Sequence, residues 1–148
     1  MLSRIPRFTK YAARKLEYGI SFYTALFGAF LLAPPTSMNS PNFTLVLNTL
    51  PEWQWAMLML VTGVIHTYAL HINGRAAWTP FARLGVLFIN SQIFISIALA
   101  IARHSPFSSG VFTYGFLGIG FCGMALYAAG VDCGREVKIW RERRNAGS

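Results

Sequence analysis

The sequence predicts an all-α integral membrane protein, a single domain in which four transmembrane helices form a bundle. Apolar residues make up 54% of the 148 residues and charged residues only 12%, whereas charged residues make up about 25% of a typical soluble domain. Basic residues gather beside alternate ends of the apolar runs, as they do in membrane proteins. The four runs cover about residues 18–33, 53–73, 81–102 and 111–131.

The first run is short, and Pro34-Pro35 ends it, because proline cannot continue a helix. We expect a retained span and not a signal peptide, since Pro34 is unfavourable directly after a cleavage site. The loop that follows has apolar residues at helical spacing, namely Phe43, Val46, Leu47 and Leu50. This spacing predicts a short helix that lies in the outer interface with its apolar face toward lipid.

The second and third runs form the clearest element of the prediction. Residues 53–73 contain no Asp, Glu, Lys or Arg, and Arg83 is the only charged residue in 81–102. At 1.5 Å per residue, each run extends roughly 30 Å as a helix, which is the thickness of the hydrocarbon core of a bilayer. A short turn around Gly74 and Arg75 joins them. The two runs therefore predict a transmembrane helical hairpin.

The distribution of basic residues predicts the orientation. With four spans, the basic ends 1–17 and 132–148 share one side with the central turn, and this side carries twelve Lys and Arg residues against only Arg103 on the other. The positive-inside rule then places both termini in the cytoplasm. Interfacial tryptophans mark the two surfaces, with Trp53 and Trp55 at one and Trp78 and Trp140 at the other.

The net charge of +8 is located in flanking segments, which favours anionic lipid head groups over nucleic acid as the partner. The basic residues of the C-terminal tail alternate with apolar ones, as in a surface-lying helix that binds anionic lipid. These residues are Arg135, Lys138, Arg141, Arg143 and Arg144. An acidic partner protein is the alternative for this tail.

A polar cluster is predicted inside the second and third spans, formed by Thr62, His66, Asn90, Ser91 and Gln92. Counted from the shared turn, His66 lies roughly 10 Å deep and Asn90 roughly 13 Å deep, so the two side chains are expected to meet. We favour an interhelical hydrogen-bond clamp, worth about 0.6 to 2 kcal/mol per bond in a membrane. The alternative is a proton relay, ligand site or pore lining.

No cofactor, metal site or catalytic motif is predicted, and we expect a protein that is not an enzyme. Glu17, Glu52 and Asp132 fall at the edges of the spans, although ion-coupled transport usually places a carboxylate within a span. A pair of haem-binding histidines within one chain is disfavoured, because the histidines lie at different depths. A ligand- or haem-binding site centred on His66 is retained as a minor alternative. Phosphate-binding glycine loops and zinc-ligand spacings do not occur.

The fourth span carries a face of small side chains that recur at spacings of three and four, namely Gly115, Gly118, Cys122, Ala125 and Ala129. Such a face allows close approach of another helix. Two interpretations are open. The face receives the first or third span of the same chain, or it receives a second copy of the chain.

The layout of residues 30–105 combines a proline-rich outer loop, an aromatic entry at Pro51-Glu52-Trp53-Gln54-Trp55, His66, and Ile72-Asn73-Gly74-Arg75 before a helix that carries Arg83. This layout resembles small membrane proteins encoded by tailed phages and prophages of Gram-negative bacteria. The resemblance implies lysis, holin-like permeabilisation or interference with superinfection. We therefore expect a non-enzymatic inner-membrane protein that acts through self-association or a membrane partner. The alternatives are a holin-like pore and a ligand-binding subunit.

Overall fold

The computed structural model describes residues 7–33, 38, 40–73 and 76–146, with the side chains described from residue 14 onward. The expected helix stop at Pro34-Pro35 and the centre of the predicted turn at 74–75 lie outside the described residues. Throughout the described part of the chain the regular structure is helical, with no strand and one isolated bridge between Asn73 and Ala76. The predicted all-α class is confirmed.

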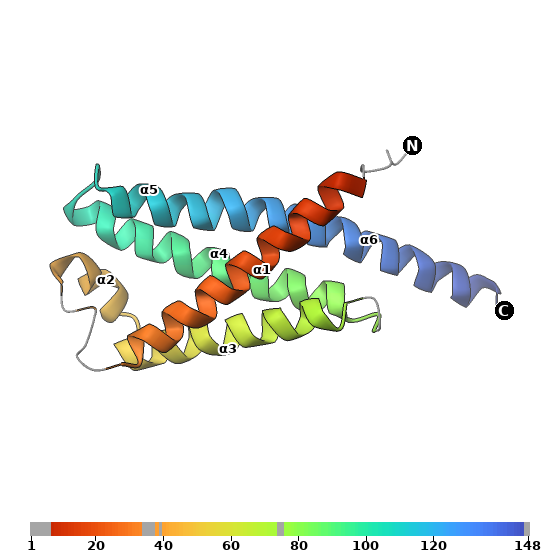
Figure 1. The fold of residues 1–148 in the computed structure, drawn as a ribbon, viewed down its shortest axis with the longest axis horizontal. Helices are drawn as coiled ribbons and strands as arrows, with labels where there is room; N and C mark the ends of the chain where they lie inside the picture. The colour runs from red at the N-terminus through yellow and green to blue at the C-terminus, as the bar shows by residue number, and fades with distance from the viewer. Residues whose placement is uncertain (1–6, 34–37, 39, 74–75, 147–148) are drawn as a thin grey trace.

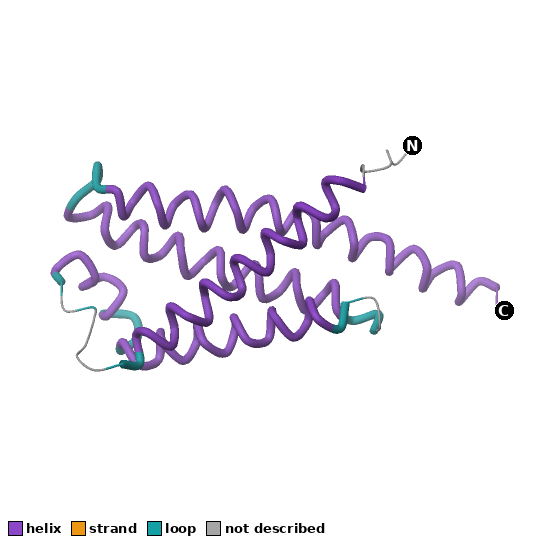
Figure 2. The backbone as a smooth tube through the Cα atoms, viewed as in Figure 1, coloured by secondary structure: helices purple, strands orange, loops and turns teal. Residues whose placement is uncertain are grey.

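Four long helical rods account for most of the described residues (Figure 1). They are α1 (Arg7–Leu31), α3 (Glu52–His71), α4 (Thr79–His104) and a continuous rod of α5 (Ser109–Gly115), the π-helical η2 (Phe116–Phe121) and α6 (Cys122–Ala146). The rods lie lengthwise beside one another, and α1 crosses them obliquely (Figure 2). Both termini and the α3–α4 connection lie at one end, which we call the basic end, and α6 extends beyond it (Figure 1).

Two rods are long and apolar enough to cross a membrane by length and composition. They are α4, with a mean hydropathy of 2.1, and the rod Ser109–Ala146, with a mean hydropathy of 1.5. Charged residues in the first half of α1, including Glu17, and polar residues in α3, such as Gln54 and His66, lower the apolar character of the other two rods. Four membrane spans therefore stay a prediction.

Two glycines allow α1 and α3 to pack backbone against backbone. A Cβ atom on Gly63 of α3 would lie 2.5 Å from the backbone nitrogen of Ala25, and one on Gly28 of α1 would lie 2.5 Å from the backbone nitrogen of Leu60. No other residue type fits at such separations, because a Cβ atom there would overlap the facing backbone. Small residues of this kind are the usual means of close helix packing in membranes.

The predicted outer helix is present as η1 (Pro41–Phe43) and α2 (Thr44–Leu47). Its apolar face does not point away from the protein as expected. Val46 is buried in the core cluster, and Phe43 packs against the same cluster. The indole nitrogen of Trp55 donates to the Val46 carbonyl oxygen at 3.0 Å, so this tryptophan is buried inside the protein. The short helix therefore closes the end of the bundle opposite the basic end.

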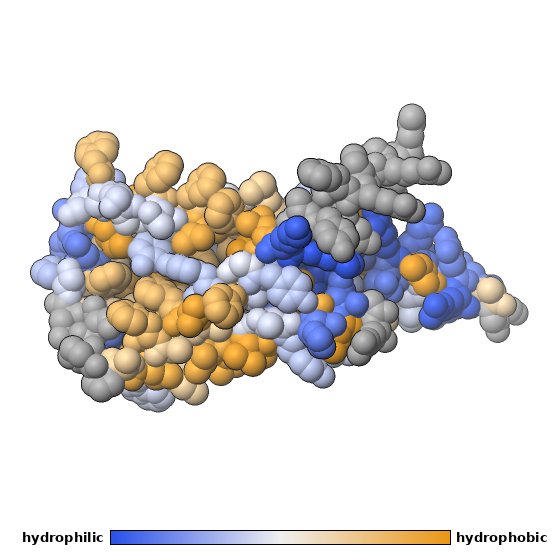
Figure 3. Space-filling model, in the orientation of Figure 1, coloured by the Kyte–Doolittle hydropathy of each residue, from blue (hydrophilic) through white to orange (hydrophobic). Residues whose placement is uncertain are grey.

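The described residues combine an exposed apolar surface with polar side chains buried in a mostly apolar core. Large apolar side chains are exposed on every long rod, for example Phe30 (61%), Phe88 (58%) and Phe112 (77%). On the face shown in Figure 3, most of the apolar surface lies on the part of the bundle away from the basic end, and hydrophilic surface follows the C-terminal part of α6. The interior holds polar residues, namely Glu17, Ser21, Thr24, Thr62, His66, Thr79, Arg83, Asn90 and Ser91.

Candidate functional site

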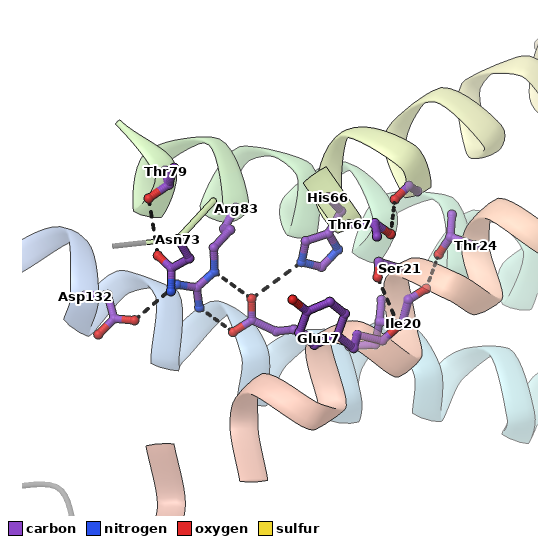
Figure 4. A network of polar contacts seen from close by, with 12 residues as sticks. Glu17, Ile20, Ser21, Thr24, His66, Thr67, Asn73, Thr79, Arg83 and Asp132 are labelled. Atoms are coloured by element: carbon purple, nitrogen blue, oxygen red, sulfur yellow. Dashed lines mark hydrogen bonds and ion pairs between the residues drawn. The ribbon is translucent and has the colours of Figure 1, made fainter. Parts of the chain in front are cut away.

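The centre of the candidate site is an ion pair between α1 and α4. The Arg83 Nε atom donates to Glu17 Oε2 at 2.8 Å, and Arg83 Nη2 donates to Glu17 Oε1 (Figure 4). The side chains are 1% and 0% exposed, respectively. The planar guanidinium group thus engages both carboxylate oxygens, which is the strongest geometry for such a pair.

Two further residues attach α3 and α6 to this pair. Arg83 Nη1 donates to Asp132 Oδ2 at 3.2 Å, and the Asp132 carboxylate also lies 3.6 Å from Arg135 Nη1. His66 Nε2 lies 3.5 Å from Glu17 Oε2. We call Glu17, His66, Arg83 and Asp132 the charged cluster. It connects the four long rods near the basic end.

Asn73 continues these contacts toward the end of the bundle. Its side-chain amide lies 3.2 Å from the Thr79 hydroxyl. When the amide oxygen faces the two nearby guanidinium groups, it accepts from Arg14 Nη2 at 3.1 Å and from Arg83 Nη1 at 3.3 Å. The connection between α3 and α4 is thereby attached to the N-terminal helix.

The geometry explains how charges are accommodated in the interior. Taking an ion out of water costs several kcal/mol, and only good geometry with additional hydrogen bonds offsets this cost. Arg83 has an acceptor for each of its three nitrogen atoms. Removal of Arg83 would leave the buried Glu17 carboxylate without its bidentate partner, so the cluster favours this one arrangement of the rods. Chemically it is an ion-pair clamp with a histidine in contact.

The expected contact of His66 with Asn90 is not formed. The partner of His66 is Glu17, which comes from the first rod. His66 Nδ1 and both amide atoms of Asn90 are buried and have no hydrogen-bond partner among the described residues. The depth argument missed this partner because it compared only the second and third predicted spans.

The other members of the predicted polar cluster are dispersed. The Thr62 hydroxyl donates to the Leu58 carbonyl of its own helix at 2.8 Å. The Ser91 hydroxyl donates to the Gly118 carbonyl at 2.8 Å and thereby joins α4 to the fourth rod. Gln92 is exposed. These residues contribute local and pairwise bonds, and they do not form one site.

Most of the predicted small-residue face lies inside the protein. Gly118, Cys122, Ala125 and Ala129 are buried, whereas a Cβ atom on Gly115 would have open space around it. A Cβ atom on Gly118 would lie 3.1 Å from the backbone nitrogen of Ile95 on α4 and 3.1 Å from the Ser91 carbonyl oxygen. The face at Gly118 therefore receives the third predicted span of the same chain and leaves no space there for a second copy.

Sequence reasoning placed Glu17 and Asp132 at the edges of spans and gave them no role, but the structure places both in the charged cluster. Three signals were present. Glu17 is the only acidic residue before Glu52, and Arg83 is the only charged residue in its apolar run. His66 and Arg83 are also at similar distances from the turn that joins their helices.

The basic tail is exposed on α6, where Lys138 lies 3.8 Å from Glu142 and the Arg144 guanidinium lies over the Trp140 ring. Within the described residues, no group of three or more His, Cys, Asp or Glu side chains is placed to hold a metal ion. Comparisons with protein-family models, curated proteins and solved structures found no match to this chain. The functional proposal therefore depends on the fold and on the charged cluster.

Proposed function

We propose that the chain is a non-enzymatic protein of a bacterial inner membrane, with four spans and both termini in the cytoplasm. It acts by assembling with itself or with a membrane partner, in a phage or prophage context. The charged cluster holds the four rods in one arrangement at the cytoplasmic end. The apolar outer surface of this bundle is then the surface that meets lipid and partner helices.

The exposed apolar surface and the buried polar groups together carry the proposal. A soluble monomer rarely exposes large contiguous apolar patches, whereas large apolar side chains such as Phe30, Phe88 and Phe112 are exposed here on several rods. In lipid the same surface is matched to its surroundings, and the polar groups that lipid cannot hydrogen-bond lie inside the protein. Intramembrane ionisable residues usually face the bundle interior and pair with one another, as Glu17 and Arg83 do.

The location of the charges supports the proposed orientation. Arg83 lies four residues after the start of α4, which is about 6 Å along the helix axis, so the cluster lies near the polar boundary of the bilayer. Trp78 and Trp140 are exposed at the same end of the protein, where interfacial tryptophans are favoured. The basic tail begins directly after Asp132.

Labelling of single cysteines in cells tests the topology. Cys122 and Cys133 are replaced by alanine, and one cysteine is introduced either by Ser105→Cys, at the α4–α5 connection, or by Ser148→Cys, at the C-terminus. A membrane-impermeant thiol reagent should label Ser105→Cys in intact spheroplasts and should label Ser148→Cys only after lysis. Equal labelling of both in intact spheroplasts, or extraction of the protein by alkaline carbonate, would contradict the proposal.

Crosslinking in the native membrane tests the assembly. A lipid-soluble crosslinker should produce a ladder of multiples of the chain or one band that contains a second protein. The crosslinked bands should persist at lower expression levels, because a specific complex, unlike chance contacts, does not require a high density of the protein in the membrane. Only monomer at every expression level would refute action through assembly.

A holin-like permeabiliser is the second candidate, and one observation favours it. Buried polar residues continue from the charged cluster along α1, α3 and α4, namely Ser21, Thr24, Thr62 and Asn90, and the Asn90 amide has no described partner. A polar interior of this kind can line a path for water when subunits rearrange. Induced expression with an impermeant DNA dye tests it. Abrupt dye entry supports permeabilisation, and normal growth without dye entry at high expression refutes it.

A further inference from the structure

A pocket of about 430 Å³ lies at the basic end of the bundle. Its walls come from α1, from the connection between α3 and α4 together with the start of α4, and from α6. It is therefore formed by segments far apart in the sequence and depends on the arrangement that the charged cluster holds. The pocket is outside the cluster itself, although the two share Asp132.

Three arginines line this pocket, Arg14 from α1 and Arg135 and Arg143 from α6. Two carboxylates, Asp132 and Glu136, line it as well, so the lining has a formal excess of one positive charge. Asp132 is already engaged by Arg83 and by Arg135. The three arginines of the lining therefore carry more positive charge than its two carboxylates neutralise.

The guanidinium groups of Arg14 and Arg143 retain free donors. The described contact of Arg14 is with the Asn73 amide oxygen, in the orientation in which that oxygen faces it. Arg143 is exposed and has no ion pair with the described residues. A planar guanidinium fork binds the oxygens of a phosphate group with two parallel hydrogen bonds. Because Arg14 and Arg143 line the same pocket from different helices, both offer such a fork to a phosphate group that enters it.

The other lining residues fit the part of a lipid next to its phosphate. Pro80 and Ile139 supply apolar walls, against which a glycerol backbone can pack. In the proposed membrane orientation the pocket lies at the depth of the cytoplasmic head groups, because it is formed by the segment just before α4 and by α6 beyond the bundle. Basic pockets between helices on this side of a membrane bind phospholipid head groups.

We propose that this arginine pocket binds the phosphodiester group of an anionic phospholipid. This proposal rests on the membrane function proposed above and assigns a defined site to the lipid. The single excess positive charge matches one phosphodiester charge, which favours a lipid with net charge −1, such as phosphatidylglycerol, over a zwitterionic one. Inorganic phosphate has the same binding chemistry, and the experiment separates the two sources.

Native mass spectrometry of the full chain, purified in detergent and delipidated, measures the binding of phosphatidylglycerol and of phosphatidylethanolamine. The double variant Arg14→Gln/Arg143→Gln should lose about tenfold in affinity for phosphatidylglycerol, since two charge-assisted contacts are removed. The control Lys15→Gln/Arg103→Gln removes the same charge at two exposed residues outside the pocket and outside the basic tail, and it should stay within about twofold of the wild type. Equal losses in both variants would show diffuse attraction and overturn the proposal.

Sodium phosphate added as a competitor shows whether the pocket prefers the phosphate of a lipid head group or free inorganic phosphate. Displacement of the lipid only at phosphate concentrations far above those of the lipid supports a head-group site. Displacement at comparable concentrations would assign the pocket to soluble phosphate and overturn the lipid proposal. The single variant Arg143→Gln repeats the measurement at an exposed residue, where misfolding cannot cause the loss, and it should retain the wild-type thermal unfolding midpoint.

Failure of the membrane proposal is recognisable separately. A chain released from membranes by alkaline carbonate would contradict the membrane function before any lipid is added. A chain that stays in the membrane but binds phosphatidylglycerol equally well with and without Arg14 and Arg143 would refute the pocket alone.

Discussion

Replacing Arg83 by methionine is expected to lower the free energy of unfolding by about 3 to 5 kcal/mol, which is the usual cost of breaking a buried ion pair by removing one partner. The variant loses both bonds to Glu17 and the bond to Asp132. Glu17 is 0% exposed, so its carboxylate would be left in the interior, where His66 at 3.5 Å is its remaining partner among the described residues. Methionine approximates the aliphatic stem of arginine, so the change tests the charge more than the packing.

Unfolding in mixed detergent micelles, followed by tryptophan fluorescence, measures the change. Arg103→Met is the matched control, because Arg103 is exposed at the opposite end of α4 and has no ion pair with the described residues. This control should change the free energy of unfolding by no more than about 0.5 kcal/mol.

The double variant Glu17→Leu/Arg83→Met completes the test. Replacing both partners of a buried pair by apolar residues is often neutral or stabilising by about 1 to 4 kcal/mol. Asp132 is 18% exposed and retains Arg135 at 3.6 Å, so it is not stranded. The double variant should therefore recover most of the stability lost by Arg83→Met. The clamp is refuted if Arg83→Met is no more destabilising than Arg103→Met. It is also refuted if the double variant is less stable than Arg83→Met alone.

Thermal unfolding in detergent tests three further variants and one control. Gly63→Ala should destabilise the protein by about 1 to 3 kcal/mol, because its Cβ atom would overlap the α1 backbone. The control Gly85→Ala has open space around its Cβ atom and should be neutral or stabilising by up to about 1 kcal/mol. Equal effects of the two substitutions would refute the close packing of α1 and α3. Asn90→Leu should be neutral or stabilising, because it removes unpartnered buried polar atoms, and a marked loss would reveal a partner such as water. Ser91→Ala should cost about 0.6 to 1.7 kcal/mol through its lost bond to the Gly118 carbonyl, and no loss would show that this bond does not contribute.

Several features followed from local sequence because their causes are local. Apolar runs long enough for full helices predicted α3 and α4 nearly at their observed positions. The short helix after Ser40-Pro41 followed from its capping residue and apolar spacing, since Ser40 accepts from the Asn42 backbone nitrogen. The burial of that helix against the bundle did not follow, because spacing identifies an apolar face without indicating what covers it.

What the sequence by itself determined is the helical class, the apolar character of the rods and the gathering of charge beside alternate rod ends, because hydrogen bonding within a helix and hydropathy depend on near neighbours. The tertiary structure alone decided which polar groups meet. Glu17 and Arg83 are 66 residues apart, and they come together only in the packed bundle, in which α1 lies against α3 at Gly28 and Gly63. Pairing between distant residues depends on the crossing of whole helices, which no local pattern specifies.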